Sequence, residues 1–324
     1  MRRSIQILLV TAALLFYSFG ASALTLRFAH STSHDSLQQE MALHFKAQLE
    51  QRTSGDIRVE IFPMGQLGTD QQLLQGAKSG TIDIVLMGAN NYSGELPEIA
   101  VFTLPFIFGD REAAYRVLDG EVGNAFLSMM EKFGVKGLGY PENGFRNMTN
   151  NRKPIKMPAD VSGLNMRVNN SKVLAEMFRM LGATPHEIPV AELYAAFDMG
   201  LVNAQDHPVG VVVSQQYYFV QRYLSMTQHA YSPLVLSMSM KSYMKLSEQQ
   251  RTIVEEVAKS SVDMQRELSA TKESGLLEEL EQNGMIINHD VDSATFQEEV
   301  KPVWDSFIEK HGEEWTSKIQ DALK

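Results

Sequence analysis

The feature that most restricts the fold of this chain is the alternation of apolar strands with amphipathic helices in its N-terminal half. Residues 24–29 read as a short strand. The segment that follows has an apolar residue at every fourth position, which is typical of one buried helix face: Leu37, Met41, Phe45 and Leu49. A helix that follows a strand in this way favours parallel pairing with the next strand.

The same order continues further along the chain. Residues 57–61 alternate apolar with charged side chains, which predicts a strand with one buried side. Residues 70–78 predict a helix that ends at Gly80, and residues 82–87 predict another apolar strand. Strands separated by helices indicate βαβ units and therefore an α/β fold.

The second half has the same organisation without repeating the sequence. Residues 165–168 predict a strand, and residues 174–181 carry the apolar stripe of a helix that Gly182 ends. Residues 201–204 and 236–240 predict two more strands.

A long helical segment then begins at a capping box formed by Ser247 and Gln250. The helical pattern continues towards Asn283 and is interrupted at Gly275. A helix of this length is long for a globular protein, and it is suited to span two lobes and brace them.

The first residues predict export from the cytoplasm. Arg2 and Arg3 precede an apolar run over residues 5–19, and Ala23 completes a small-residue cleavage pattern. We therefore expect a signal peptide over residues 1–23, cleaved after Ala23, and a periplasmic mature protein. The alternative, a membrane anchor, needs about 20 apolar residues, and the run is shorter.

Composition limits the remaining classes. The net charge of −10 argues against a nucleic-acid partner, which would require a basic surface. An anionic ligand would have to be attracted by local arginines against this overall charge. The chain has no cysteine, so neither a disulfide nor a lipid on cysteine is expected.

The sequence holds no strong enzyme signature. It lacks the GxSxG, P-loop and GxGxxG patterns, and its histidines lack the spacing of a zinc site, so we expect no metal and no cofactor. The adjacent pair Asp206 and His207 is the one candidate for acid–base chemistry. It leaves a secreted enzyme as an alternative to a binding protein.

Two arginines are better candidates for function. Arg146 and Arg167 both lie in neutral surroundings, and no acidic residue lies within five positions of Arg167. Arg167 comes at the end of a predicted strand, where α/β proteins bind ligands, and its planar guanidinium matches a carboxylate. A surface position or a distant acidic partner remains the alternative.

Amide side chains follow two of the predicted strands. Asn90 and Asn91 come after the strand at residues 82–87, and Asn169 and Asn170 come after the strand that contains Arg167. Amides both donate and accept hydrogen bonds, which suits a ligand rich in hydroxyl groups. Asparagine is also common in turns, so this signal alone does not decide the matter.

Five stretches in a fixed order give the mature chain a resemblance to the DctP-type solute-binding proteins of TRAP (tripartite ATP-independent periplasmic) transporters. The stretches are Phe62-Pro-Met-Gly-Gln-Leu-Gly68, Leu104-Pro-Phe-Ile-Phe108, Gly144-Phe-Arg146, Pro158-Ala-Asp-Val-Ser-Gly-Leu-Asn-Met-Arg167 and Ala204-Gln-Asp-His-Pro208. The resemblance covers nearly the whole mature chain.

The resemblance implies roles for individual residues. Arg167 falls on the family's ligand arginine and would clamp a carboxylate, and Arg146 falls on its second arginine. His207 stands where the family motif usually has asparagine, a departure that resembles binders of 2,3-diketogulonate and uronates. The implied ligand-binding set is Ser31, Asp70, Asn90, Asn91, Arg146, Arg167, Asn169, Asn170 and His207.

The resemblance also implies an architecture and partners. The expected fold is two α/β lobes around a ligand cleft, with lobe one over residues 24–143 and 233–272 and lobe two over residues 144–232 and 273–324. The expected ligand is a sugar acid, with a C4-dicarboxylate as the alternative. The expected partners are the two membrane subunits of the transporter, and a sensor that reports to a receptor is a further alternative. We expect a monomer.

Overall fold

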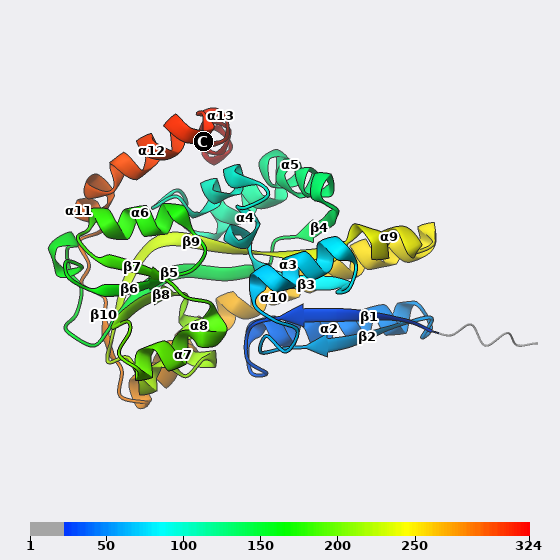
Figure 1. Ribbon diagram of the computed structural model, residues 1–324, viewed down its shortest axis with the longest axis horizontal. Helices are drawn as coiled ribbons and strands as arrows, with labels where there is room; N and C mark the ends of the chain where they lie inside the picture. Colours follow the sequence, from blue (N-terminus) through cyan, green and yellow to red (C-terminus); the bar gives the residue numbers. More distant parts are fainter. Residues whose placement is uncertain (1–22) are drawn as a thin grey trace, which may run out of the picture.

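The computed structural model describes residues 23–324, which form an α/β fold built on a ten-stranded sheet (Figure 1). The strands are β1 Leu24–His30, β2 Ile57–Phe62, β3 Ile84–Gly88, β4 Val135–Gly139, β5 Glu142–Asn150, β6 Asn165–Val168, β7 Thr184–Glu187, β8 Ala204–His207, β9 Tyr223–Ser239 and β10 Ile286–Asn288. The predicted signal peptide falls on residues outside this range, and cleavage after Ala23 stays a prediction.

The helices lie on both faces of the sheet, with α6, α11 and α12 on one side and α7 and α8 on the other (Figure 1). They are α2 Leu37–Arg52, α3 Asp70–Ser79, α4 Arg111–Asp119, α5 Glu121–Met129, α6 Lys172–Met180, α7 Val190–Asp198, α8 Val209–Ser214, α9 Met240–Lys245, α10 Glu248–Gln282, α11 Ser293–Glu299, α12 Lys301–His311 and α13 Glu314–Leu323. Within residues 23–324, no helix has the length and apolar character that crossing a membrane requires.

Two parallel units stand at opposite ends of the sheet. In the first, β1 pairs in parallel with β2 and β3, and in the second, β6 pairs in parallel with β7 and β8. The βαβ arrangement expected from the alternation of strands and helices is therefore confirmed. The carboxyl ends of these parallel strands supply most of the functional side chains described below.

The long strand β9 connects the two units. It pairs antiparallel with β5 up to Pro233 and with β3 from Leu234 onwards. This change of partner lies at the junction expected between the lobes, whose full boundaries remain a prediction. The strand expected at residues 236–240 is thus the end of a much longer strand, and Met240 already begins α9.

The strand expected at residues 201–204 was placed too early in the chain. The observed strand β8 covers Ala204–His207, and all four of its residues are buried. Three of them are polar, and their side chains form hydrogen bonds inside the protein, for example from Gln205 to Thr149. A search for apolar runs misses a strand of this kind, because most of its buried side chains are polar and form hydrogen bonds rather than hydrophobic contacts.

Helix α10 begins at the capping box predicted at Ser247 and continues for 35 residues. Val254, Val257 and Val262 pack with the apolar core beside β1 and α2, whereas Leu280 packs with the core around α8. The expected interruption at Gly275 is wrong, because the helix passes through that residue unbroken. A single glycine costs a helix only about 1 kcal/mol, which the packing at both ends offsets.

The end of β1 carries a histidine that is inaccessible to solvent, His30. Its Nε2 lies 2.9 Å from Oε1 of Gln39 in α2, and its Nδ1 lies 3.0 Å from the hydroxyl of Thr32. Burial lowers the pKa of His30 to about 4. The imidazole is therefore neutral in the folded protein at any pH near 7.

The lowered pKa of His30 leads us to expect a smaller free energy of unfolding in mild acid. The unfolded chain binds a proton at a pKa of about 6.5, so lowering the pH from 7 to 5 favours unfolding by about 2 kcal/mol through His30. Urea unfolding at both pH values should show a smaller drop for His30→Gln than for the parent. The exposed His289 is the control, and His289→Gln should keep the parent's drop. Equal drops in all three proteins would contradict the assignment.

Candidate functional site

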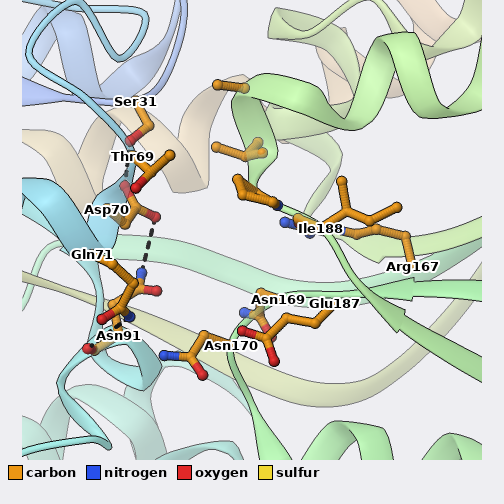
Figure 2. A pocket seen from close by; sticks show the side chains of 13 residues that line it. Ser31, Thr69, Asp70, Gln71, Asn91, Arg167, Asn169, Asn170, Glu187 and Ile188 are labelled. Carbon is orange, nitrogen blue, oxygen red and sulfur yellow. Dashed lines mark hydrogen bonds between the residues drawn. The ribbon is translucent and has the colours of Figure 1, made fainter.

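A cavity of about 160 Å³ lies between the two parallel units of the sheet (Figure 2). One wall comes from the end of β1, the start of α3 and the short helix η1 (Ala89–Tyr92). The other comes from the ends of β6 and β7 and the start of α7. A second cavity of about 70 Å³ shares several of these residues: Ser31, Asp70, Asn91, Arg167, Asn169 and Val190.

Arg167 lies on the wall of this cleft that β6 supplies. Its side chain comes from β6 and is only 2% exposed. Nε donates to the backbone oxygen of Ile188 at 2.8 Å, and Nη1 lies 3.0 Å from Nε2 of His207. Among residues 23–324 no carboxylate forms an ion pair with it, and three of its five N–H groups have no partner there.

An unpaired buried guanidinium is electrostatically unfavourable. Burial lowers the pKa of Arg167 to about 10, and the positive charge of Arg146 acts in the same direction. The group nevertheless remains protonated at neutral pH. An anion that enters the cleft would therefore remove part of the cost of burying this charge.

The contact with Arg167 fixes the protonation of His207. A guanidinium can only donate, so Nε2 of His207 must accept, and its Nδ1–H donates to Oε1 of Gln205. Burial, together with the charges of Arg167 and Arg146, holds the pKa of His207 well below its usual value. His207 is thus a neutral acceptor that orients the arginine.

Arg146 has a different environment from the one expected. It is 1% exposed, and it forms a buried ion pair with Asp206, with 2.5 Å from Nε to Oδ2 and 3.0 Å from Nη2 to Oδ1. Its Nη1 reaches towards Ser232 on the wall of the second cavity. The charge of Arg146 is therefore already neutralised, whereas that of Arg167 is not.

Asp206 is held by two neighbours. Besides the ion pair with Arg146, its Oδ2 lies 3.2 Å from Nε2 of the buried His229. Although burial opposes ionisation, the charge of Arg146 and the bond to His229 keep the pKa of Asp206 far below its ordinary value. Asp206 and His207 are neighbours in β8, but their side chains bond to different partners.

The opposite wall of the cleft carries an acid. Asp70 is the first residue of α3, and its carboxylate accepts hydrogen bonds from the hydroxyl of Ser31 and from Nδ2 of Asn91, the latter at 3.0 Å. Figure 2 shows these three side chains on the side of the cavity that faces Arg167. Burial raises the pKa of Asp70, and the bond from Ser31 and the charge of Arg167 oppose that rise.

The remaining predicted residues also meet at the cleft. Nδ2 of Asn90 donates to the backbone oxygen of Asn170 at 3.3 Å, a bond between the two walls. Oδ1 of Asn169 is buried and has no hydrogen-bond partner in the described part of the chain. Asn169 therefore offers a free acceptor on the same wall as Arg167.

Several wall residues were not predicted. Glu187 is the last residue of β7 and lines the cleft. The sequence pattern did not predict this short strand. The association of strand ends with ligand sites could therefore not be applied to Glu187. Gln38 and Asn143 line the second cavity and are joined by a 3.0 Å hydrogen bond. The other residues of the main cavity are Thr69, Gln71, Ile188, Pro189, Val190 and Ala191.

Comparison with known proteins identifies close relatives. Residues 28–311 match the family model DctP, described as bacterial extracellular solute-binding protein, family 7. The 2,3-diketo-L-gulonate-binding periplasmic protein YiaO of Escherichia coli K12 is 35% identical over 308 residues, covering 94% of each chain. The C4-dicarboxylate-binding periplasmic protein DctP of Rhodobacter capsulatus is 28% identical, covering 93% of this chain and 92% of its own.

A solved structure is similar over the same extent. The sugar acid binding protein DctPAm from Advenella mimigardefordensis, in complex with galactonate, superposes with a TM-score of 0.90 at 30% identity. The match covers 93% of this chain and 98% of that one.

The ion pair of Arg146 with Asp206 gives a stability prediction. Asp206→Asn leaves a guanidinium charge buried without a partner, which should lower the free energy of unfolding in urea by about 3–5 kcal/mol. Glu256 is the control, because its side chain and that of its partner Arg52 are 56% and 38% exposed. Glu256→Gln should cost about 1 kcal/mol or less. Similar losses for the two variants would show that burial does not govern these pairs.

Proposed function

The chain belongs to the DctP family of TRAP solute-binding proteins, and we propose that it captures a sugar acid by its carboxylate in the periplasm and delivers it to a membrane permease. Solute-binding proteins of this family are periplasmic, bind small organic acids and work with membrane permease components. They have a two-lobed fold, and the fold described above is of this kind.

The observation that carries the proposal is the unpaired guanidinium of Arg167 inside the cleft. An ion pair at about 4 Å is worth roughly 4 kcal/mol at an effective dielectric constant of 20, before desolvation is counted. His207 and the backbone oxygen of Ile188 hold the group in place, so little ordering is needed when the ligand arrives. A carboxylate is the anion that such a planar fork binds best in two-point contact.

The rest of the cleft supports a hydroxylated ligand. Its walls offer carboxylates, hydroxyls and several amides, which together can donate to and accept from the hydroxyl groups of a sugar acid. Relatives named for 2,3-diketo-L-gulonate and galactonate fit this composition. A C4-dicarboxylate, which the Rhodobacter capsulatus relative binds, is the second candidate.

Binding by closure of the two lobes follows from the position of the residues. Arg167 and Asn169 belong to the predicted lobe two, whereas Ser31, Asp70 and Asn91 belong to the predicted lobe one. A ligand that bonds to both walls favours the closed state, because only that state lets it make all its contacts. The hydrogen bond from Asn90 to Asn170 also joins the two walls, which supports contact between them on closure.

The predicted site residues, the monomeric state and delivery to two membrane subunits form part of the same proposal. A secreted enzyme that acts on sugar acids through Asp206 and His207 is less well supported, because the carboxylate of Asp206 already binds Arg146 and His229. Incubation with candidate acids separates the classes. A rise in melting temperature with no change in the acid's NMR spectrum supports a binding protein, and turnover would support an enzyme.

The role of Arg167 gives a binding prediction. Arg167→Ala should weaken binding of the best acid in that screen at least about a hundredfold, since losing one partner of a buried charge pair costs about 2–5 kcal/mol. Arg167→Lys should also lose much of the affinity, because an ammonium cannot make the two-point contact. Isothermal titration calorimetry measures both.

The exposed Arg179 on α6 is the control for the loss of one positive charge. Arg179→Ala should bind like the parent protein. Near-parental affinity of Arg167→Lys would argue against bidentate recognition, and near-parental affinity of Arg167→Ala would refute the proposed site.

A further inference from the structure

Two oppositely charged side chains come from the two walls of the cleft. Arg167 lies on one wall and Asp70 on the other, and both line the same cavity (Figure 2). No lysine or arginine of residues 23–324 forms an ion pair with Asp70, and Arg167 is the cation whose charge acts on it. A ligand carboxylate bound to Arg167 would therefore neutralise the positive charge that favours the ionised form of Asp70.

The carboxylate of Asp70 is held in a fixed orientation. It stands at the N-terminus of α3, where the helix dipole favours a negative charge. Ser31, at the end of β1, donates to one of its oxygens, and Asn91, in η1, donates to the other. A carboxylate has about four lone-pair positions, so two remain to accept hydrogen bonds from a ligand.

From this arrangement we infer that Asp70 determines ligand class: it accepts hydroxyl hydrogens of the bound acid and excludes acids that carry a second carboxylate at that end. The inference rests on the proposed function and names its substrate as a polyhydroxy monocarboxylate. A dicarboxylate that reached from Arg167 to the opposite wall would place its second charge against Asp70, with no second cation to offset it.

Two further features support this role. Burial raises the pKa of Asp70, so the carboxylate gains stability from every added donor, and ligand hydroxyls are such donors. Glu187 is exposed and lines the same cavity, so it adds a second negative charge that would repel a dianion. The cleft as a whole therefore favours an acid with one negative charge.

Calorimetry with two probes, galactonate and succinate, tests the inference in the full-length mature protein. The parent should bind galactonate at least tenfold more tightly than succinate. Asp70→Asn removes the charge at nearly the same shape, and it should weaken galactonate at least tenfold while succinate binding stays equal or improves. The ratio of the two affinities should thus fall at least tenfold.

Two other variants separate charge from shape. Asp70→Glu keeps the charge but displaces it, so it should weaken galactonate and continue to exclude succinate. Glu192→Gln removes an exposed charge in the first turn of α7, outside the cavity wall, and should leave both affinities unchanged. Thermal melting of each variant without ligand identifies any that fails to fold, and Asp70→Ala, which also removes the charge, then serves in place of Asp70→Asn.

The outcomes separate the role of Asp70 from the proposed function. A parent that binds galactonate, with an affinity ratio that Asp70→Asn leaves unchanged, overturns the role of Asp70 and leaves the proposed function standing. Tighter binding of succinate than galactonate by the parent also overturns it. A parent that gives no heat and no thermal shift with any sugar acid or dicarboxylate overturns both.

Discussion

The site depends on how one guanidinium group is held. β6 lies between β7 and β8 in the sheet, so Arg167 has the oxygen of Ile188 on one side and the imidazole of His207 on the other. Both neighbours are neutral acceptors. They fix the orientation of the charge without cancelling it, which leaves the charge available to a ligand and gives the empty protein an unfavourable term that an anion removes.

The second arginine of the cleft shows the contrast. Arg146 is as deeply buried as Arg167, but Asp206 neutralises it and His229 supports Asp206 in turn. With Arg146 neutralised, Arg167 is the arginine whose charge remains available to the contents of the cleft. The acid on the opposite wall, Asp70, then limits what the uncharged part of the ligand can be.

The sequence was sufficient to predict the first three strands, helix α3 and strand β6, because their inward residues are apolar and repeat with the period of the element. It was not sufficient for β8 and the first half of β9, where buried polar residues such as Gln205, Thr227 and His229 interrupt the apolar pattern. The family motifs pointed to Arg167 and His207, which lie in contact in the structure. The pairing of Arg146 with Asp206 joins residues 60 positions apart, which no local pattern reveals. Glu187 was missed because the short strand before it carries no periodic signal.

Helix α10 is unbroken over 35 residues, and a helix with that number of residues is about 50 Å long. Its first half is fixed in the core beside α2, and its last turns are fixed in the core around α8. A rigid rod anchored in this way acts as a lever. A tilt of about 5° at one end would move the other by about 4 Å, so a small rearrangement in one core would be passed on as a larger displacement of the other core.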